Sequence, residues 1–240
     1  MSSLELRVSS LRRATPSTRI IRLDLAGAPF SYKPGQLAVI GVPDHGPRVP
    51  YSIASAPAET ARGGYLEFLA RVDPHTRLRE IRRGSRLTVE GPVGSFTFPD
   101  NPKEKSFLFV AGGTGIAPLR SMILHAVTTG RRGGLHLLYS ARTPADFAYL
   151  RELRQLERKG ELALALTATR EVPPRWRGTR GRITRDRLAP LVETPETLCF
   201  VCGPAAMVDD VPRMLVDLGI EKTRIRIEER EETQNLELRT

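Results

Sequence analysis

Three glycines in the segment AGGTGIAPLRSMI, residues 111–123, have the spacing of a backbone turn that can receive phosphate groups. Gly112, Gly113 and Gly115 follow an apolar run and precede a stretch with helical periodicity. Glycines let the main chain approach a ligand closely, and a helix N-terminus supplies N–H groups and a partial positive charge. The pattern predicts a pyrophosphate site of a dinucleotide that includes Thr114 as well. The alternative is a tight turn in a doubly wound domain, with no ligand.

The residues after the next two predicted strands favour a phosphate on the ribose of that dinucleotide. Pro118 stands where the commonest fingerprint has its third glycine, and no acidic residue closes the next strand. The strand ends instead carry Ser140 and Arg142 in YSARTP, and Thr169 and Arg170 in TATREV. A guanidinium offers a charge-assisted fork to a 2′-phosphate, so NADP is predicted and NAD stays possible. Alternatively, these are ordinary surface arginines of an arginine-rich chain.

The two cysteines form a C-x-x-C pattern that could suggest a metal site or a redox dithiol. Cys199 and Cys202 lie in the apolar run TLCFVCGP, which reads as a buried strand. Positions i and i+3 of a strand point to opposite faces, so neither a disulfide nor a zinc site is predicted. The four histidines show no ligand spacing, and an iron–sulfur cluster needs about four thiolates. No metal is therefore expected.

The net charge of +10 comes from 37 Lys and Arg against 27 Asp and Glu, and the cations are almost all arginine. The charge is spread over the chain and aromatic residues make up only 6%, so nucleic-acid binding is not favoured. No apolar run of membrane-spanning length and no secretory signal is evident, which predicts a soluble, cytoplasmic chain without a membrane span.

Two different periodicities divide the chain at the polar segment 99–105, PDNPKEK. Before it, short runs with alternating apolar residues predict an antiparallel sandwich or barrel, with one short helix near 76–83 capped by Thr76. After it, strands alternate with helices, which predicts a parallel sheet covered on both faces. The predicted domains are 1–100 and 101–240, the latter with a tail at 231–240. The early strands are expected at 19–25, 36–42, 51–55, 65–72 and 86–91, the later ones at 107–113, 135–140, 161–168, 197–203 and 224–228, and the later helices near 117–129, 144–159 and 205–218.

Five segments in order resemble the ferredoxin–NADP reductase superfamily of FAD- and NAD(P)H-dependent oxidoreductases. They are FSYKPGQ at 30–36, RVPYSIAS at 48–55, GPVGSFTF at 91–98, GGTGIAP at 112–118 and CGPAAM at 202–207. The resemblance covers nearly the whole chain. It implies an antiparallel β-barrel flavin domain followed by an α/β doubly wound parallel-sheet nucleotide domain, without an iron–sulfur domain.

On the flavin side, the resemblance implies that Tyr51 packs on the flavin ring and that Ser52 forms a hydrogen bond near flavin N5. Arg48 would neutralise the FAD phosphates, and Thr76 would receive the FAD pyrophosphate at a helix N-terminus. The family usually writes R-x-Y-S, whereas two residues separate Arg48 from Tyr51 here. A tyrosine in this position could also be simple packing.

On the nicotinamide side, the resemblance implies that Cys202, with Gly203 and Pro204 of the same motif, faces the site of hydride transfer. A small side chain leaves room for the nicotinamide to lie on the flavin, although Cys202 could also be a buried structural residue. Glu228 fits the acid that relatives carry near their C-terminus. Arg230 stands where relatives have an aromatic residue, and we expect its guanidinium to stack over the flavin.

These residues together predict an enzyme, a flavoprotein reductase that moves hydride between NADP(H) and FAD. The electrons would pass to a separate acceptor such as ferredoxin or flavodoxin, an acidic carrier attracted by arginines such as those between Arg77 and Arg86. Two alternatives stay open: a reductase component of an oxygenase or a free-flavin reductase, and a non-catalytic flavin-binding electron-transfer subunit of a larger complex. The sequence leaves open FAD against FMN, the direction of transfer, the acceptor and the oligomeric state.

Overall fold

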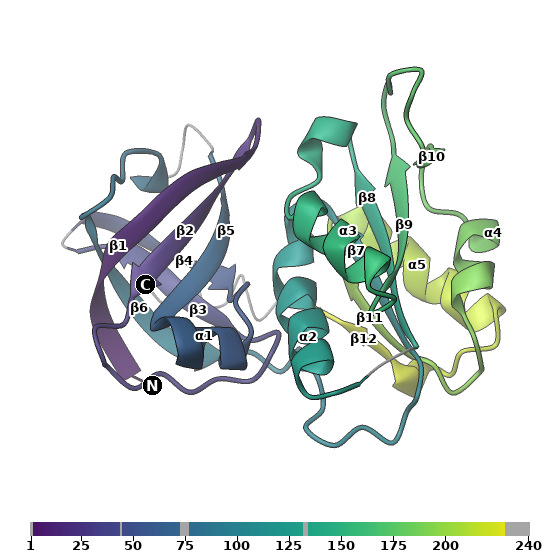
Figure 1. Ribbon diagram of the computed structural model, residues 1–240, viewed down its shortest axis with the longest axis horizontal. Helices are drawn as coiled ribbons and strands as arrows, with labels where there is room; N and C mark the ends of the chain where they lie inside the picture. The colour runs from purple at the N-terminus through teal and green to yellow at the C-terminus, as the bar shows by residue number, and fades with distance from the viewer. Residues whose placement is uncertain (1, 44, 73–76, 132–133, 229–240) are drawn as a thin grey trace. The chain divides into compact units, whose positions relative to one another are not determined.

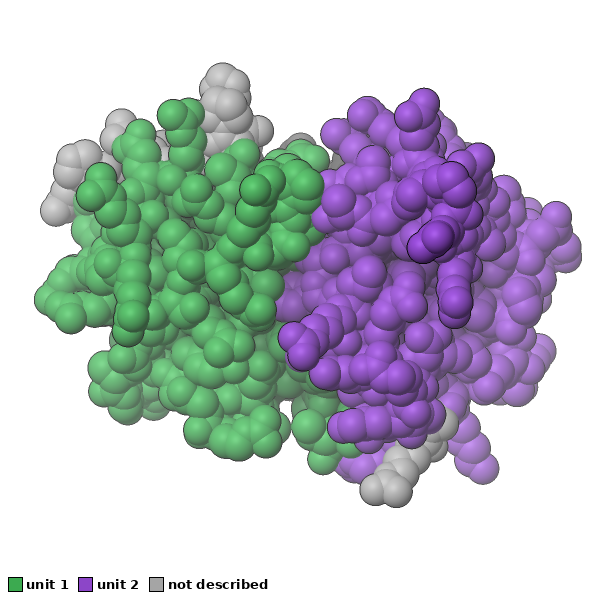
Figure 2. All heavy atoms as spheres, turned by 45° about the horizontal axis from the view of Figure 1, so that its top comes forward, with its two compact units in different colours: residues 1–98, 120–128, 229–240 green, residues 99–119, 129–228 purple. Residues whose placement is uncertain are grey.

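The computed structural model describes residues 2–43, 45–72, 77–131 and 134–228 of the 240-residue chain. Its residues form two compact units, coloured separately in Figure 2. The N-terminal unit comprises the chain up to Phe98 together with Arg120–Thr128, and the C-terminal unit comprises Pro99–Leu119 and Thr129–Glu228. No helix in the described ranges has the length and apolar character needed to cross a membrane.

The N-terminal unit is built on a six-stranded antiparallel sheet in the order β4-β3-β6-β1-β2-β5 (Figure 1). Alternating residues of these strands point inward, which explains the period of two in the sequence. A bridge from Ile53 to Phe68 joins the end of β4 to β5, so the two edges of the sheet meet and the sheet closes like a barrel. The elements are β1 Ser2–Thr15, β2 Thr18–Asp24, β3 Leu37–Val42, β4 His45–Ser52, α1 Pro57–Gly63, β5 Tyr65–Arg71, η1 Arg77–Arg79 and β6 Arg86–Val93.

The helix predicted near 76–83 is wrong for the part that is described, because only the three-residue 3-10 turn η1 forms there. Leu78 and Ile81 of this segment insert into the barrel core. Gly84 then adopts a positive φ of 92° and donates its N–H to the Val8 carbonyl, which draws the segment into contact with β1 instead of continuing a helix. Thr76, the predicted cap, lies outside the described residues.

The C-terminal unit is built on a six-stranded parallel sheet in the order β10-β9-β8-β7-β11-β12. The order reverses after β7, which makes the sheet doubly wound, with α3 and α5 on opposite faces (Figure 1). With the barrel-like sheet, this arrangement confirms the predicted fold class. Helix α2, Ile116–Thr128, begins in this unit, and its residues from Arg120 on belong to the N-terminal unit. The other elements are β7 Phe107–Gly112, η2 Gly113–Gly115, β8 Leu135–Ala141, η3 Pro144–Asp146, α3 Leu150–Arg158, β9 Ala163–Ala168, β10 Thr179–Arg180, α4 Arg185–Leu188, η4 Ala189–Leu191, β11 Leu198–Cys202, α5 Ala205–Asp217, η5 Lys222–Arg224 and β12 Ile225–Ile227.

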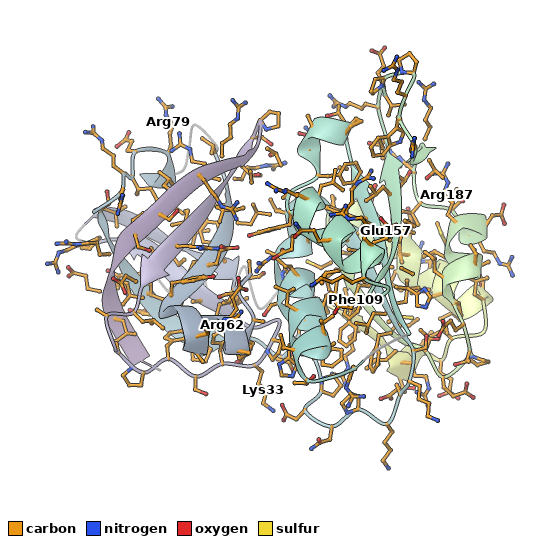
Figure 3. The ribbon with its side chains drawn as sticks, viewed as in Figure 1. Lys33, Arg62, Arg79, Phe109, Glu157 and Arg187 are labelled. Atoms are coloured by element: carbon orange, nitrogen blue, oxygen red, sulfur yellow. The ribbon has the colours of Figure 1, made fainter. Side chains whose placement is uncertain are left out.

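Two adjacent interior strands of this sheet, β7 and β11, are buried along their whole length. Phe109 of β7 stacks on Phe200 of β11 with ring centroids 5.3 Å apart, and Phe109 is labelled inside the sheet in Figure 3. Strands covered on both faces are apolar at every position, which is why both were readable as continuous runs. Their carboxyl ends bring two of the sequence motifs together.

Candidate functional site

The glycine turn after β7 and the turn after β11 interlock at the carboxyl edge of the parallel sheet. A Cβ on Gly112 would lie 2.6 Å from Cδ of Pro204, and a Cβ on Gly115 would lie 2.2 Å from the carbonyl oxygen of Cys202. Gly203 approaches the backbone of Gly112 in the same way, with 3.0 Å from its Cβ position to Cα of Gly112. The structure thus brings together the GGTG and CGP segments, 90 residues apart in the sequence, and it does so through glycines at contacts too close for any side chain.

Gly113 differs from its neighbours because nothing lies within 4 Å of its Cβ position. Its φ of 56° is in the left-handed region, so glycine is needed here for conformation and not for packing. Its carbonyl accepts the N–H of Ile116 and starts the helical run into α2. The first N–H groups of such a run have no intrahelical acceptors, and an approaching anion can use them.

Cys202 and Glu228 meet at the end of β11. The Cys202 Sγ lies 2.8 Å from Oε2 of Glu228, so the thiol donates to the carboxylate. The backbone N–H of Glu228 donates to the Val201 carbonyl at 3.3 Å, which places the acid beside the strand end. Both cysteines are buried, and burial raises the pKa of the Cys199 thiol to about 12. Both cysteines are free thiols.

The four residues predicted to hold a 2′-phosphate come from two neighbouring strand ends. Arg170 donates its backbone N–H to the Arg142 carbonyl at 2.9 Å, and Thr169 donates to the Ala141 carbonyl at 3.0 Å. These bonds extend the pairing of β8 and β9 beyond the sheet, so the two arginines follow directly opposite one another. Ser140 pairs with Gly112 across β7 and β8, next to the glycine turn.

Arg142 and Arg170 are both solvent-exposed, as is Thr169. No carboxylate forms a salt bridge with either guanidinium in the part of the chain that the structure describes. Two exposed guanidinium groups at adjacent strand ends leave a positive charge that an anionic ligand can neutralise.

The flavin-side residues lie on β4. Tyr51 and Ser52 are half-buried, and Tyr51 packs partly against the barrel core. Arg48 forms an ion pair with Glu90 of β6, a partner that sequence reasoning missed. The Glu90 carboxylate therefore occupies one side of the Arg48 guanidinium and balances its charge. Arg48 can then bind a phosphate mainly through hydrogen bonds and less through net charge. Thr76 and Arg230 lie outside the described residues.

A buried ionic cluster next to α1 and β5 was also missed from the sequence. Arg120 of α2 forms two hydrogen bonds to Glu59, at 3.0 and 3.2 Å, and lies 3.6 Å from Glu67. Arg22 binds the other oxygen of Glu67 at 2.7 Å. Burial acts to raise the pKa of Glu59, but the hydrogen bonds and charge of Arg120 outweigh it and the pKa is lowered. One sequence signal was available, because Arg120 lies within the largely apolar stretch IAPLRSMILHAV.

Tyr139 of β8 was also missed from the sequence. Its side chain is fully buried, and its hydroxyl lies 3.0 Å from the Gly113 carbonyl. Burial raises its pKa far above the ordinary value. In the sequence it reads as one more aromatic residue of a buried strand, and nothing there reveals its bond to the glycine turn.

Comparison with known proteins identifies relatives over nearly the whole length. The family model described as "Oxidoreductase NAD-binding domain" matches residues 109–213. The chain is 31% identical over 246 residues to "Ferredoxin--NADP reductase B" of Sorangium cellulosum, covering 93% of this chain and 96% of that protein. It is 28% identical over 231 residues to the "Propane 2-monooxygenase, reductase component" of Rhodococcus jostii (strain RHA1), covering 91% of this chain and 60% of that protein. Among solved structures, "Ferredoxin reductase in carbazole 1,9a-dioxygenase" matches with a TM-score of 0.81 and 26% identity, over 95% of this chain and 69% of that one.

Proposed function

The chain belongs to the ferredoxin–NADP reductase superfamily of FAD- and NAD(P)-binding oxidoreductases, and from this we propose that it is an NADPH-dependent flavoprotein reductase that passes electrons to an acidic carrier protein. A bound flavin supplies the chemistry, because it accepts a hydride and releases single electrons. The residues of this chain bind and orient the two cofactors. The observation that carries the proposal is the interlocked pair of turns after β7 and β11, with the Cys202–Glu228 hydrogen bond beside them.

The glycine turn fits a pyrophosphate. Gly113 leaves open space where a side chain would stand, and the helical run behind it supplies N–H donors. Gly203 and Pro204 line the same edge of the sheet through their contacts with Gly112. We assign the pyrophosphate of the nicotinamide coenzyme to this turn, with Thr114 as a further donor.

Arg142 and Arg170, supported by Ser140 and Thr169, are assigned to the 2′-phosphate of NADPH. Both guanidinium groups follow adjacent strand ends and lack a carboxylate partner among the described residues. A charge-assisted hydrogen bond is worth about 1.5–3 kcal/mol. Losing the hydrogen bonds of both arginines should weaken NADPH binding by about 100-fold or more, since each 1.4 kcal/mol is a factor of ten in the dissociation constant.

At the end of β11, we assign the nicotinamide ring to the space beside Cys202. The thiol keeps its proton and donates a hydrogen bond to the Glu228 carboxylate, so the Cys202 side chain stays neutral and small. Glu228 acts by holding the thiol in one orientation. On β4, Tyr51 and Ser52 are assigned to the flavin ring and Arg48 to a flavin phosphate. FAD is the proposed flavin.

The test starts with the cofactor released from the purified protein, identified by absorbance and mass. Anaerobic titration with NADPH and then NADH follows, read at the flavin absorbance. The double variant Arg142→Ala/Arg170→Ala should weaken NADPH strongly and NADH little. Arg151→Ala/Arg158→Ala, two exposed arginines of α3, is the matched control and should change neither. Equal losses for both coenzymes would contradict the 2′-phosphate assignment, and a colourless protein that takes up no flavin would contradict the function.

The acceptor is proposed to be an acidic one-electron carrier such as ferredoxin or flavodoxin. Arg79, Arg82, Arg83 and Arg86 are exposed on the N-terminal unit, and Arg79 is labelled in Figure 3. Arg86 lies directly across from Arg7 in the β1–β6 pair. Arg86 also forms an exposed ion pair with Glu5 at 2.8 Å, which offsets part of the repulsion between the two arginines. It is the clustering of exposed arginines that supports an acidic carrier.

A second candidate is the reductase component of an oxygenase, because two of the relatives above bear such names. Steady-state NADPH oxidation separates the candidates. If only ferredoxin or flavodoxin accelerates the oxidation, the first candidate is supported. If an oxygenase component accelerates it, the second is supported. Equally fast oxidation with free flavin and no added protein would support neither candidate.

A further inference from the structure

The hydroxyl of Tyr139 lies in a chain of hydrogen bonds whose direction is fixed by chemistry. The backbone N–H of Ala148 can only donate, and it donates to the Tyr139 hydroxyl at 3.2 Å. The carbonyl of Gly113 can only accept, and it lies 3.0 Å from the same hydroxyl. The proton of the hydroxyl therefore points at Gly113.

This bond sets the orientation of the peptide group after Gly113. A trans peptide is planar, so the C=O of Gly113 and the N–H of Thr114 point in opposite directions. With the carbonyl held by Tyr139 and by the N–H of Ile116, the Thr114 N–H is turned away from Tyr139. A glycine with φ of 56° and open space around its Cβ position could otherwise rotate this peptide at low cost.

Two further rings keep the hydroxyl in place. The Tyr139 ring meets Phe147 edge-on, with centroids 4.9 Å apart and an interplanar angle of 84°. Phe147 in turn stacks on Trp176 at 5.5 Å and 13°. The Trp176 Nε1–H donates to the Thr179 carbonyl at 3.3 Å, which fixes the outermost ring to β10. The support extends from the glycine turn to the β9–β10 connection.

We propose that Tyr139 is a positioning residue for coenzyme binding, whose hydroxyl holds the glycine turn with its N–H groups facing the pyrophosphate. The inference rests on the proposed role of that turn in binding the coenzyme. Tyr139 itself touches no ligand. It lowers the cost of binding, because the donors are oriented before the anion arrives.

Tyr139→Phe tests this by removing one oxygen and keeping the ring. We expect the dissociation constants of NADPH and NADH to rise by the same factor, about tenfold, as for the loss of one well-placed hydrogen bond. The inhibition constant of inorganic pyrophosphate should rise in proportion, whereas that of adenosine 2′-monophosphate, which has no pyrophosphate, should not change. Flavin content and the turnover at saturating NADPH should stay at the wild-type level.

Tyr32→Phe is the matched control. The Tyr32 hydroxyl is also buried, with hydrogen bonds to the Ser55 carbonyl at 2.9 Å and to Thr60 at 2.7 Å, but it belongs to the N-terminal unit. Its loss should lower the melting temperature without changing the pyrophosphate inhibition constant. If Tyr139→Phe does not fold, Trp176→Leu, at a half-exposed position, keeps the hydroxyl and loosens its support, and pyrophosphate binding should weaken.

The outcomes separate the inference from the proposed function. A wild-type protein that binds neither coenzyme nor pyrophosphate overturns the function. A wild-type protein that binds both, with Tyr139→Phe unchanged in pyrophosphate affinity, overturns only the role of Tyr139. A larger loss for NADPH than for NADH also overturns it, since the pyrophosphate is common to both.

Discussion

Replacing Arg120 with methionine should destabilise the N-terminal unit more than any surface charge change, because the buried Arg120 neutralises the buried Glu67 and the half-buried Glu59. Its side chain is 3% exposed, against 17% for Glu59 and 0% for Glu67. It also donates to the Ala54 carbonyl at 2.6 Å. Only Arg22, at 32% exposure, would remain to compensate the two carboxylates.

The expected cost follows from this geometry. Breaking a buried ion pair costs about 3–5 kcal/mol, because a charge is left buried without its partner. Arg22 keeps its bond to Glu67 and Glu59 is partly accessible to water, so the lower end of the range, about 3 kcal/mol, is expected. In a protein of this size that is a fall of roughly 6–12 °C in melting temperature. Methionine preserves much of the length of the side chain and limits any cavity.

The cost should also depend on pH. In the wild type the pKa of Glu59 is lowered, so its stabilisation is present above about pH 4.3 and is lost as the pH falls through the folded-state pKa. Without Arg120, we expect burial, the largest influence on Glu59, to outweigh the hydrogen bonds from Tyr65 and Ala56 and to raise its folded-state pKa above the unfolded value. The variant then loses stability as the pH rises from about 4.3. The difference between wild type and variant should be largest near neutral pH and small near pH 4.

Urea unfolding of both proteins between pH 4 and pH 8 measures this difference. Arg86→Met is the control, since its ion pair with Glu5 has side chains 64% and 47% exposed and should be worth less than about 1 kcal/mol. Adding Glu59→Gln to Arg120→Met should restore part of the loss at pH 7. A cost for Arg120→Met below about 1 kcal/mol, or one that is the same at pH 4.5 and pH 7.5, would refute the reasoning.

Three further predictions concern the C-terminal unit and the acceptor. Gly115→Ala places a Cβ 2.2 Å from the Cys202 carbonyl oxygen, so coenzyme binding should be largely lost in titrations, whereas unchanged binding would show that the turns can separate. Cys202→Ala removes the hydrogen bond to Glu228 and should slow flavin reduction in stopped-flow measurements, with little change in flavin content. In this variant the remaining thiol, Cys199, should react with a thiol reagent at pH 8 only after unfolding. Reduction of an acidic carrier should slow as salt rises, and a rate independent of ionic strength would exclude steering by the exposed arginines.

The elements that the sequence predicted correctly are those whose packing repeats along the chain. The runs that became β7 and β11 are apolar at every position because both faces of the sheet are covered. Where a single residue decides the conformation, the prediction was less accurate. One helix was expected near 144–159, but Tyr149 has a positive φ of 59°, and the segment forms η3 and then α3. The two-residue β10 and the four-residue α4 are too short to leave a periodic signal.

The candidate site divides in the same way. The glycine turn and the Cys202 turn were found because each is a compact motif, and their residues lie next to one another in the sequence. Arg48 and Glu90 are 42 residues apart, and Arg120 and Glu59 are 61 residues apart. Pairs at such separations depend on strand register and helix placement, which periodicity in one segment does not specify. A charged residue within an apolar helix is the one sign that a distant partner exists.

The three glycines of one motif serve different physical purposes, which a pattern of letters cannot separate. Gly112 and Gly115 are required by contacts of 2.6 and 2.2 Å with the turn after β11, so any side chain there pushes two strand ends apart. Gly113 meets nothing, and only its φ of 56° calls for glycine. A glycine that no neighbouring atom holds in place can leave its conformation easily, because glycine has many backbone conformations of similar energy. No side chain packs around the Cβ position of Gly113, so the hydrogen bond from the buried Tyr139 hydroxyl is what restricts its conformation. A turn that binds a ligand must stay open on the ligand's side, so its conformation has to be held by contacts on the opposite side.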